Sequence, residues 1–446
     1  MKIVAFLNKY VFVTAVPIML VIAGIYYFFL LRGFHITRAP TVIRSMFRKQ
    51  DKHGISPFQA VSLALAGTLG VGNIVGVSAA IYLGGFGAVF WMWISALCAM
   101  LLKYAEIVLA MKYRVYDKDG TPSGSAMMYI RAYFNSIGLT SLGKCIAFIF
   151  AVFCVINAVT MGNMIQVNAI TRSFESVFSV SPLILGIGIA IFVFFIVSKG
   201  ISAISNLTEK LVPLMTVGYI VLSVAVMVVR ADRLGDAFYK IFSSAFDFDA
   251  ALGGITGFIF SKALRYGTMR GLISNEAGCG TAPTAHAVSN SKIPAEQGFL
   301  GVFEVFVDTI VLCTMTAIVV IISYPEVEHF GNNFIMMTVS SYSYVLGDFA
   351  KYFLLLAVFF FAFATIICWS HYGMECIRYL SKKIYVKKIF IIIYSISVLF
   401  GALFDPDWIW DVADLAIGVM TFINVIVIML MSREVKEETE LYLKKG

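Results

Sequence analysis

Residues 67–76 read Gly67-Thr68-Leu69-Gly70-Val71-Gly72-Asn73-Ile74-Val75-Gly76 and lie inside a long apolar run. Each of the four glycines weakens a helix by about 1 kcal/mol relative to alanine, so a helix here is poorly held at its middle. No charged side chain occurs between Ile55 and Leu102. The pattern predicts a membrane helix that is broken at Gly70–Asn73. Lipid tolerates such a break only where the freed backbone groups line a cavity or bind a ligand.

The composition of the whole chain also points to lipid as its solvent. Of the 446 residues, 60% are hydrophobic and only 13% are charged, and the mean hydropathy is +0.88. Soluble domains carry about twice that share of charge. A helix needs about 20 apolar residues to cross a bilayer, and each span must satisfy its own hydrogen bonds, so we expect helices. Eleven apolar runs meet this requirement: 11–31, 57–83, 87–111, 142–165, 183–198, 206–229, 250–272, 297–323, 349–373, 387–404 and 408–431.

The basic residues of the loops predict the topology. One set of segments carries 25 of the 34 Lys and Arg residues, whereas the alternate set carries 7. The positive-inside rule then places the N-terminus outside and the C-terminus in the cytoplasm. The first run is too long for a signal-peptide core, so we read it as a retained span. The compact loops favour a prokaryotic plasma membrane. The basic segments are 32–56, 112–141, 199–210, 262–296, 374–388 and 432–446.

A second set of glycines occurs five spans after the first. The run 250–272 contains Gly253, Gly254 and Gly257, and more glycines follow in Arg265–Gly271. Interrupted helices at matching positions of two halves are typical of transporters built from inverted repeats, with a binding site at mid-membrane. The alternative is that the glycines only allow close helix packing, since Gly72-x-x-x-Gly76 also fits that motif.

The repeat pattern predicts one all-α transport domain over residues 1–446. We expect an extra first span and a cytoplasmic segment in 1–56, a first five-helix repeat in 57–230, a second in 250–431, and a cytoplasmic tail in 432–446. We expect a monomer in the bilayer.

Broken helices suit a zwitterionic substrate. The N-terminus of a half-helix offers free N–H groups and a positive dipole end to a carboxylate, and a C-terminus offers carbonyls to an ammonium or Na⁺. The uncharged stretch 55–102 fits Na⁺ better than a proton carrier at that helix. One charge that crosses 100 mV releases about 2.3 kcal/mol, enough for roughly 50-fold accumulation of a neutral solute.

Two polar residues in apolar runs need partners. Asn73 is stabilised either by a ligand or by a local helix cap. Asp308, with Glu304 one turn earlier, is an intramembrane acid that costs roughly 3 kcal/mol. It acts either in proton coupling or in a structural pair with Lys or Arg.

Several classes of protein are excluded. The string Gly70–Gly76 is not a dinucleotide fingerprint, and no P-loop, metalloprotease or nucleophile-elbow motif occurs, so we expect no enzyme. His286 and His371 lack partners at metal-ligand spacing, and the seven cysteines stand singly. The net charge of +8 lies mainly in the loops, so we expect no nucleic-acid partner.

The segment Gly70–Val77, followed by Leu83–Trp93, resembles the alanine or glycine:cation symporter family. Within the later part of the chain, Ser274-Asn275-Glu276-Ala277-Gly278 is highly specific for that family. The resemblance runs in the family's order to about residue 380, through Lys103–Glu106, Lys112–Arg114, Met161–Gln166, Arg265–Ala287, Val305–Thr309, Phe361–Ile366 and Trp369.

The resemblance implies the fold of the bacterial leucine transporter, with five plus five helices preceded by one additional span. It also implies Na⁺-coupled uptake of alanine or glycine, with the substrate between spans 2, 4, 7 and 9. Gly72 and Asn73 would bind its carboxylate, Gln166 would add a polar contact, and Trp369 would wall the side-chain pocket. The alternatives are a cross-helix bond for Gln166 and ordinary packing for Trp369.

The same resemblance implies a cation site between spans 2 and 9. Thr365 would be its hydroxyl ligand, beside carbonyls near Gly67 and Gly70, unless the hydroxyl simply bonds its own helix. Asp308 and Asn163 are further candidates for the site.

Five residues depart from the family's usual pattern, namely Val71, Ala364, Lys262, Glu304 and Cys279. They leave open the exact substrate, its stereochemistry and the choice between Na⁺ and H⁺. A proton-coupled transporter, a channel and a non-transporting amino-acid sensor are therefore the rival functions. We expect Glu276 to organise the cytoplasmic segment after span 7 and not to touch substrate.

Overall fold

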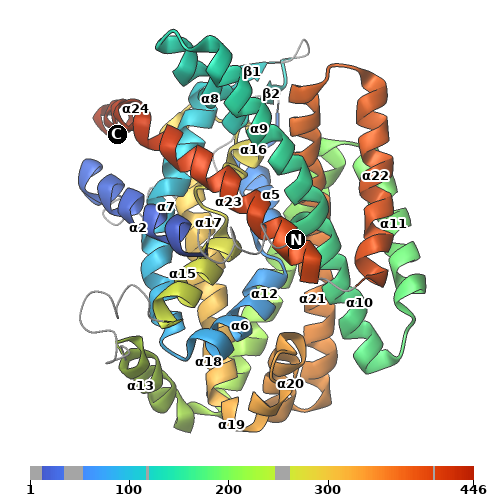
Figure 1. The fold of residues 1–446 in the computed structure, drawn as a ribbon. Helices are drawn as coiled ribbons and strands as arrows, with labels where there is room; N and C mark the ends of the chain where they lie inside the picture. Colours follow the sequence, from blue (N-terminus) through green and yellow to red (C-terminus); the bar gives the residue numbers. More distant parts are fainter. Residues whose placement is uncertain (1–12, 35–53, 117–119, 247–261, 405–406, 446) are drawn as a thin grey trace.

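The computed structural model describes residues 13–34, 54–116, 120–246, 262–404 and 407–445, which form a bundle of long helices (Figure 1). Among these residues, seven continuous helices are long and apolar enough to cross a membrane. This confirms the predicted all-α, polytopic membrane architecture, whereas the count of eleven spans remains a prediction. The seven are Ala88–Lys112, Thr140–Phe178, Ile201–Val229, Pro294–Ile322, Asp348–Leu380, Ile384–Leu403 and Trp408–Leu430.

The helix bounds follow the apolar runs of the sequence closely. The unbroken elements are α2 (Val13–Leu30), α7 (Ala88–Lys112), α9 (Thr140–Val159), α10 (Ile165–Phe178), α11 (Pro182–Ser198), α12 (Ile201–Val229), α21 (Asp348–Leu380), α22 (Ile384–Leu403) and α23 (Asp407–Leu430). The interrupted elements are α5 (Pro57–Thr68), η2 (Val71–Asn73), α6 (Val75–Gly84), α15 (Lys262–Asn275) and α16 (Ala282–His286).

Two long helices contain a wider π-helical stretch at mid-length. The segment η3 (Thr160–Met164) joins α9 to α10, and η5 (Phe306–Cys313) joins α17 (Pro294–Val305) to α18 (Thr314–Ile322). Such stretches occur often at functional sites, because the extra residue per turn redirects side chains.

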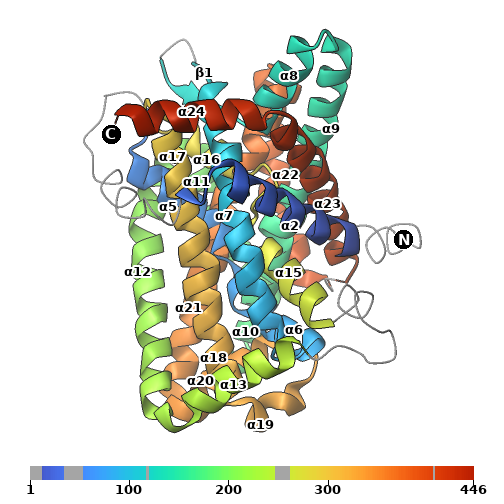
Figure 2. The ribbon, with the colours of Figure 1, turned by 90° about the vertical axis from the view of Figure 1, so that its left-hand side faces the viewer.

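Shorter elements lie at the two ends of the bundle (Figures 1 and 2). The α24 end carries α8 (Ala126–Ser136), α24 (Ser432–Lys445) and a hairpin of β1 (Val115–Tyr116) and β2 (Pro122–Ser123), antiparallel with Val115 opposite Ser123. The α20 end carries α13 (Leu234–Ala245), α19 (Tyr324–Val327) and α20 (Phe334–Leu346), with the single turns η4 (Ala231–Arg233) and η6 (Glu328–Phe330).

Helix α24 lies across the end of α7 (Figure 2). Lys112 forms an ion pair with Glu434 at 3.0 Å, and the Tyr113 hydroxyl donates to the same carboxylate at 2.6 Å. The hydroxyls of Tyr104 and Thr439 lie 2.8 Å apart in a buried hydrogen bond. The tail therefore covers the end of α7 as a packed helix.

The first part of the basic segment 262–296 is helical. This helix is α15, which begins beside Gly84, since a Cβ there would lie 3.2 Å from the Lys262 carbonyl oxygen. Helix α6 ends at Gly84, toward the α20 end (Figure 1). The start of α15, with Lys262, therefore lies toward the end of the bundle opposite to α24.

Candidate functional site

The first helix break lies where the glycines predict it. Helix α5 ends at Thr68, Leu69 and Gly70 are not helical, and α6 begins at Val75. The Val71 N–H donates to Gln166 Oε1 at 3.1 Å, and the Gly70 N–H donates to Asn73 Oδ1 at 3.2 Å. Side chains thus replace part of the hydrogen bonding that the helix loses.

Within the described residues, the second break follows the end of α15. Residues Arg265–Gly271 are continuous α-helix, and α15 ends only at Asn275. The chain then turns through Glu276, Gly278 and Gly280, with φ values of 52°, 77° and 78°. Gly253, Gly254 and Gly257 lie outside the described residues.

The helical glycines of α15 serve close packing instead. A Cβ at Gly267 would lie 2.2 Å from the Ala88 carbonyl oxygen, and a Cβ at Gly271 would lie 2.6 Å from Ser95 Oγ. Ala88 and Ser95 both belong to α7. The packing alternative is therefore correct for these two positions, because glycine is needed wherever one backbone approaches another this closely.

Two side chains of α7 stabilise the second break, one at the residue before it and one at its far end. The buried Lys103 Nζ donates to the Asn275 carbonyl, the last of α15, at 2.7 Å, and pairs with Glu304 at 3.0 Å. Glu106 Oε2 accepts from the Gly280 N–H at 3.0 Å, just before α16. A cation thus meets a helix C-terminus, as the helix dipole favours.

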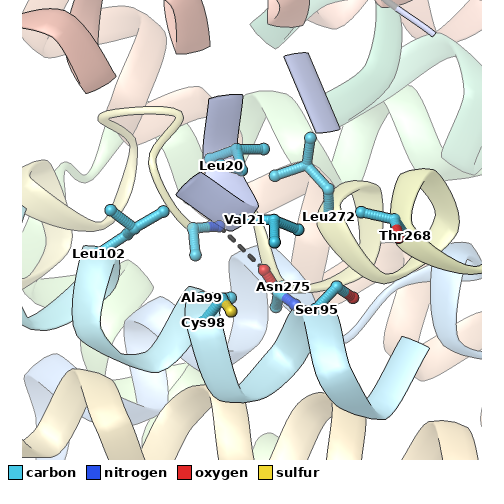
Figure 3. A pocket seen from close by; sticks show the side chains of 10 residues that line it. Leu20, Val21, Ser95, Cys98, Ala99, Leu102, Thr268, Leu272 and Asn275 are labelled. Atoms are coloured by element: carbon cyan, nitrogen blue, oxygen red, sulfur yellow. Dashed lines mark hydrogen bonds between the residues drawn. The ribbon is translucent and has the colours of Figure 1, made fainter. Parts of the chain in front are cut away.

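Helix α2 and α7 cover one side of this break (Figure 3). Leu20 and Val21 of α2, together with Cys98 and Leu102 of α7, line a small apolar pocket there. Across it, Asn275 Oδ1 accepts from the Ala277 N–H at 3.0 Å, the bond drawn in Figure 3. The turn is therefore closed on itself and shielded by apolar side chains.

A buried cavity lies between the two breaks, α10 and α21. Its volume is about 20 Å³, room for about one water molecule in this conformation. Its walls combine the backbone of the first break, one carboxylate and several large apolar side chains. The lining residues are Gly67, Thr68, Gly70, Val71, Gly72, Met161, Ile165, Gln166, Ile273, Glu276, Thr365, Trp369 and Trp410.

Three of the four predicted substrate residues line this cavity. Gly72 exposes backbone, and Gln166 bonds the break with Oε1 and the Met161 carbonyl with Nε2 at 3.1 Å. Trp369 donates from Nε1 to Glu276 Oε1 at 3.1 Å. A Cβ at Gly162 would lie 2.2 Å from the Trp369 ring, so the indole is fixed against η3.

Asn73, the fourth, points away from the cavity. Its Nδ2 donates to Asp308 Oδ1 at 2.6 Å and to Ser274 Oγ at 3.0 Å. Asp308 Oδ2 also accepts from Ser274 at 2.9 Å and from Thr309 at 2.7 Å. Asp308 is therefore held by neutral donors, and the expected pair with Lys or Arg is absent among the described contacts.

The predicted cation residues converge behind the first break. Thr365 Oγ1 lies 3.0 Å from the Ala66 carbonyl oxygen, 3.1 Å from that of Phe361 and 3.5 Å from that of Leu69. A Cβ at Gly70 would lie 2.8 Å from this hydroxyl, and one at Gly67 would lie 2.8 Å from Tyr372 Oη. Oxygen atoms are the ligands that hard cations such as Na⁺ prefer. Two of these carbonyls belong to the residues directly before the predicted glycines, since Ala66 precedes Gly67 and Leu69 precedes Gly70.

Asn163 does not reach the cavity. Its Nδ2 donates to the Tyr394 carbonyl at 2.7 Å and to Ser397 Oγ at 3.0 Å, which joins η3 to α22.

Glu276 lines the cavity, whereas the sequence analysis expected it to organise a cytoplasmic segment after span 7. It lies in the cavity wall at mid-bundle and is 2% exposed. The sequence contains a signal for the buried position of this residue. An acidic residue directly follows a helix of the membrane domain, within a glycine pattern that favours a turn, Asn275-Glu276-Ala277-Gly278-Cys279-Gly280.

Comparisons with known proteins agree on one family. The profile described as "Sodium:alanine symporter family" matches residues 1–446. The sodium/alanine symporter AgcS of Methanococcus maripaludis is 35% identical over 445 residues, with 98% of this chain and 95% of that protein covered. The probable sodium/glutamine symporter GlnT of Bacillus subtilis is also 35% identical, with 94% and 85% covered.

A solved structure shows the same fold. MhsT in complex with L-phenylalanine superposes with a TM-score of 0.56 at 16% identity, over 85% of this chain and 90% of that one. At this identity the likeness concerns the fold alone.

Proposed function

The chain belongs to the sodium:alanine symporter family, a family of transporters and not of enzymes, and we propose that it takes up alanine or glycine together with Na⁺ by alternating access. Na⁺-coupled amino-acid symport is the activity of the family; the choice of substrate is our proposal. The observation that carries it is the enclosed cavity between two helix breaks.

We assign the carboxylate of the substrate to the first break. Gly72 lines the cavity with backbone, and it lies just before α6, whose N-terminus offers free N–H groups and a positive dipole end. Gln166 stabilises the break from α10 through the Val71 N–H. Because Trp369, Met161 and Ile165 wall the remaining space, a small side chain fits best.

We assign Na⁺ to the oxygen cluster around Thr365, next to Gly67 and Gly70. The carbonyls of Ala66 and Leu69 belong to α5 and its end, whereas Thr365 belongs to α21. A cation between them would hold the two helices together and fix the break in the shape that accepts substrate. Coupling of this kind is reciprocal, so substrate should also increase the affinity for Na⁺.

We favour Na⁺ over H⁺ as the coupling ion. Both oxygens of Asp308 accept hydrogen bonds from neutral donors, an arrangement suited to a fixed carboxylate. Glu304 is paired with Lys103 at 3.0 Å and lies 3.2 Å from His286. Neither acid lines the cavity, so we propose structural roles for both.

We also propose the membrane arrangement. Eleven spans would comprise α2 and two inverted repeats, in residues 57–230 and 250–431, with the N-terminus outside and the C-terminus in the cytoplasm of a prokaryotic cell. The protein would act as a monomer in the plasma membrane.

Uptake into liposomes tests the function. Purified protein should accumulate alanine and glycine only under an inward Na⁺ gradient, and glutamine should compete poorly. Thr365→Val should raise the Na⁺ concentration for half-maximal uptake by about 10-fold or more, since it removes a ligand, whereas Thr365→Ser should keep it near the wild-type value. Uptake that persists without Na⁺ but stops with a protonophore would refute Na⁺ coupling.

A further inference from the structure

Glu276 is the one acidic residue among those that line the cavity. Trp369 Nε1 donates to its Oε1 at 3.1 Å, and Thr281 Oγ1 donates to its Oε2 at 2.8 Å. These two bonds fix the plane of the carboxylate. A carboxylate accepts about four hydrogen bonds, so each oxygen keeps capacity for one more donor.

The carboxylate has no cationic partner among the described residues. Among the described residues, no Lys, Arg or His nitrogen lies within 4.0 Å of it. The Lys103 charge acts on it from farther away, whereas Glu304 has both Lys103 and His286 at 3.0 and 3.2 Å. A buried carboxylate without a counter-ion is strongly destabilising. A positive charge supplied from outside the chain would stabilise it.

The backbone around Glu276 favours a cation as well. Glu276 directly follows α15, a helix of 14 residues whose C-terminal carbonyls carry partial negative charge. Lys103 bonds the last of these carbonyls from the α7 side.

The other buried carboxylates do not compete for this role. Asp308 is enclosed by Asn73, Ser274 and Thr309, and Glu106 accepts from the Gly280 N–H and from Asn424 at 2.9 Å. Neither lines the cavity. The oxygen cluster of Thr365, where we place Na⁺, contains no carboxylate.

We propose that Glu276 binds the α-ammonium group of the substrate, with Trp369 and Thr281 as the residues that position it. The inference rests on the proposed function and adds the determinant of amino-acid recognition. The zwitterion would span the cavity, with its carboxylate at Gly72 and its ammonium at Glu276. Compounds without the ammonium group should then be rejected, because they leave the buried carboxylate unpaired.

A competition assay with Glu276→Gln tests the proposal. Glutamine keeps the shape and can still bond Trp369 and Thr281, but it carries no charge. Wild-type and variant protein are compared for inhibition of radiolabelled alanine binding by alanine and by propionate, which lacks the ammonium. We expect the alanine-to-propionate affinity ratio to fall by about 10- to 100-fold in the variant, as expected for the loss of a charged hydrogen bond.

A control variant and a second readout separate the possible outcomes. Glu375→Gln neutralises a buried carboxylate that bonds Ser123 and does not line the cavity, and it should keep the wild-type ratio. Direct binding of ²²Na⁺ without amino acid should be unchanged in Glu276→Gln. If wild type binds no alanine, the substrate proposal fails, and the same ratio is measured with the bound amino acid and its desamino analogue.

Three results would overturn the role of Glu276. The first is an unchanged ratio in Glu276→Gln, and the second is an equal loss of alanine and propionate affinity, which indicates a structural role. The third is weaker ²²Na⁺ binding at an unchanged ratio, which would assign Glu276 to the cation. Should Glu276→Gln fail to fold, Glu276→Asp serves instead, with a smaller fall in the same ratio.

Discussion

At the scale of single residues, Gly72 presents backbone to the cavity with space beside it. A Cβ at this position would meet its nearest atom, the Ser274 Cα, at 3.6 Å, an ordinary contact. By contrast, a Cβ at Gly70 would lie within 2.9 Å of both Thr365 and Gln166. Gly70 is thus required for packing, whereas Gly72 is required only for the volume of the cavity.

This difference predicts a change of specificity in Gly72→Ala. The added methyl group fits the fold but occupies substrate space, so alanine should lose more affinity than glycine. One methyl group is worth about 1–3 kcal/mol, so the ratio of kcat/KM for glycine over alanine should rise roughly 10-fold. Gly76→Ala, where a Cβ meets nothing within 4 Å, is the matched control and should leave the ratio unchanged. An equal loss for both substrates would contradict the assignment of Gly72.

Single residues also show what sequence can and cannot reveal about the site. Glycine-rich sequence and the family resemblance together identified Gly67, Gly70, Gly72, Gln166, Thr365 and Trp369, which all line one cavity. Asn73 needed a partner, as any amide in an apolar helix does. That partner is Asp308, 235 residues away, and no local pattern could identify it.

At the scale of elements, α7 joins the two halves of the interrupted α15–α16 segment. Lys103 bonds the end of α15, and Glu106, one turn later, bonds the amide before α16. Both side chains are fully buried. Neither half-helix is stable alone in lipid, because its end groups need partners. We infer that α7 keeps the break open but ordered.

Removal of Lys103 should therefore destabilise the whole carrier. Lys103→Met leaves Glu304 and the Asn275 carbonyl without this partner, and breaking a buried ion pair on one side costs about 3–5 kcal/mol. We expect a clear fall in the apparent Tm in detergent. Adding Glu304→Gln removes the orphaned charge, and the double variant should regain at least half of the loss. A double variant as unstable as Lys103→Met would show that the pair is not the cause.

Glycine residues alone do not show where the second break lies, because glycine has two different uses in membrane helices. Glycine lowers helix propensity, but it also allows two helices to touch, and these uses cannot be told apart without the partner helix. Gly267 and Gly271 contact α7 and its first turn within an intact helix. Gly278 and Gly280 have positive φ, and they mark the actual turn.

At the scale of the whole molecule, the two ends of the bundle are distinct. The α24 end has the hairpin, α8 and the packed tail, whereas the α20 end has the short helices α13, α19 and α20 (Figures 1 and 2). The apolar runs of the sequence predicted nearly every long helix, since period and length are local properties. Helices α8, α13, α20 and α24 were missed, because they lie in segments read as loops.

The proposed orientation predicts which end a membrane-impermeant maleimide reaches in intact cells. Cys145, an exposed residue near the start of α9, lies near the α24 end and should react only after permeabilisation. Asn332→Cys, placed on the exposed turn before α20 in a Cys145→Ser background, should react in intact cells. The reverse labelling pattern would place the C-terminus outside.

The packing of α24 on α7 has a consequence for biosynthesis. The Tyr113 hydroxyl and the Glu434 carboxylate that it bonds are 321 residues apart in the chain. At about 5–20 residues per second, a ribosome makes the second residue roughly 15–60 s after the first. During that interval the end of α7, with Lys112, lies at the membrane surface without its acidic partner. A newly synthesised chain is therefore vulnerable to cellular proteases at this position.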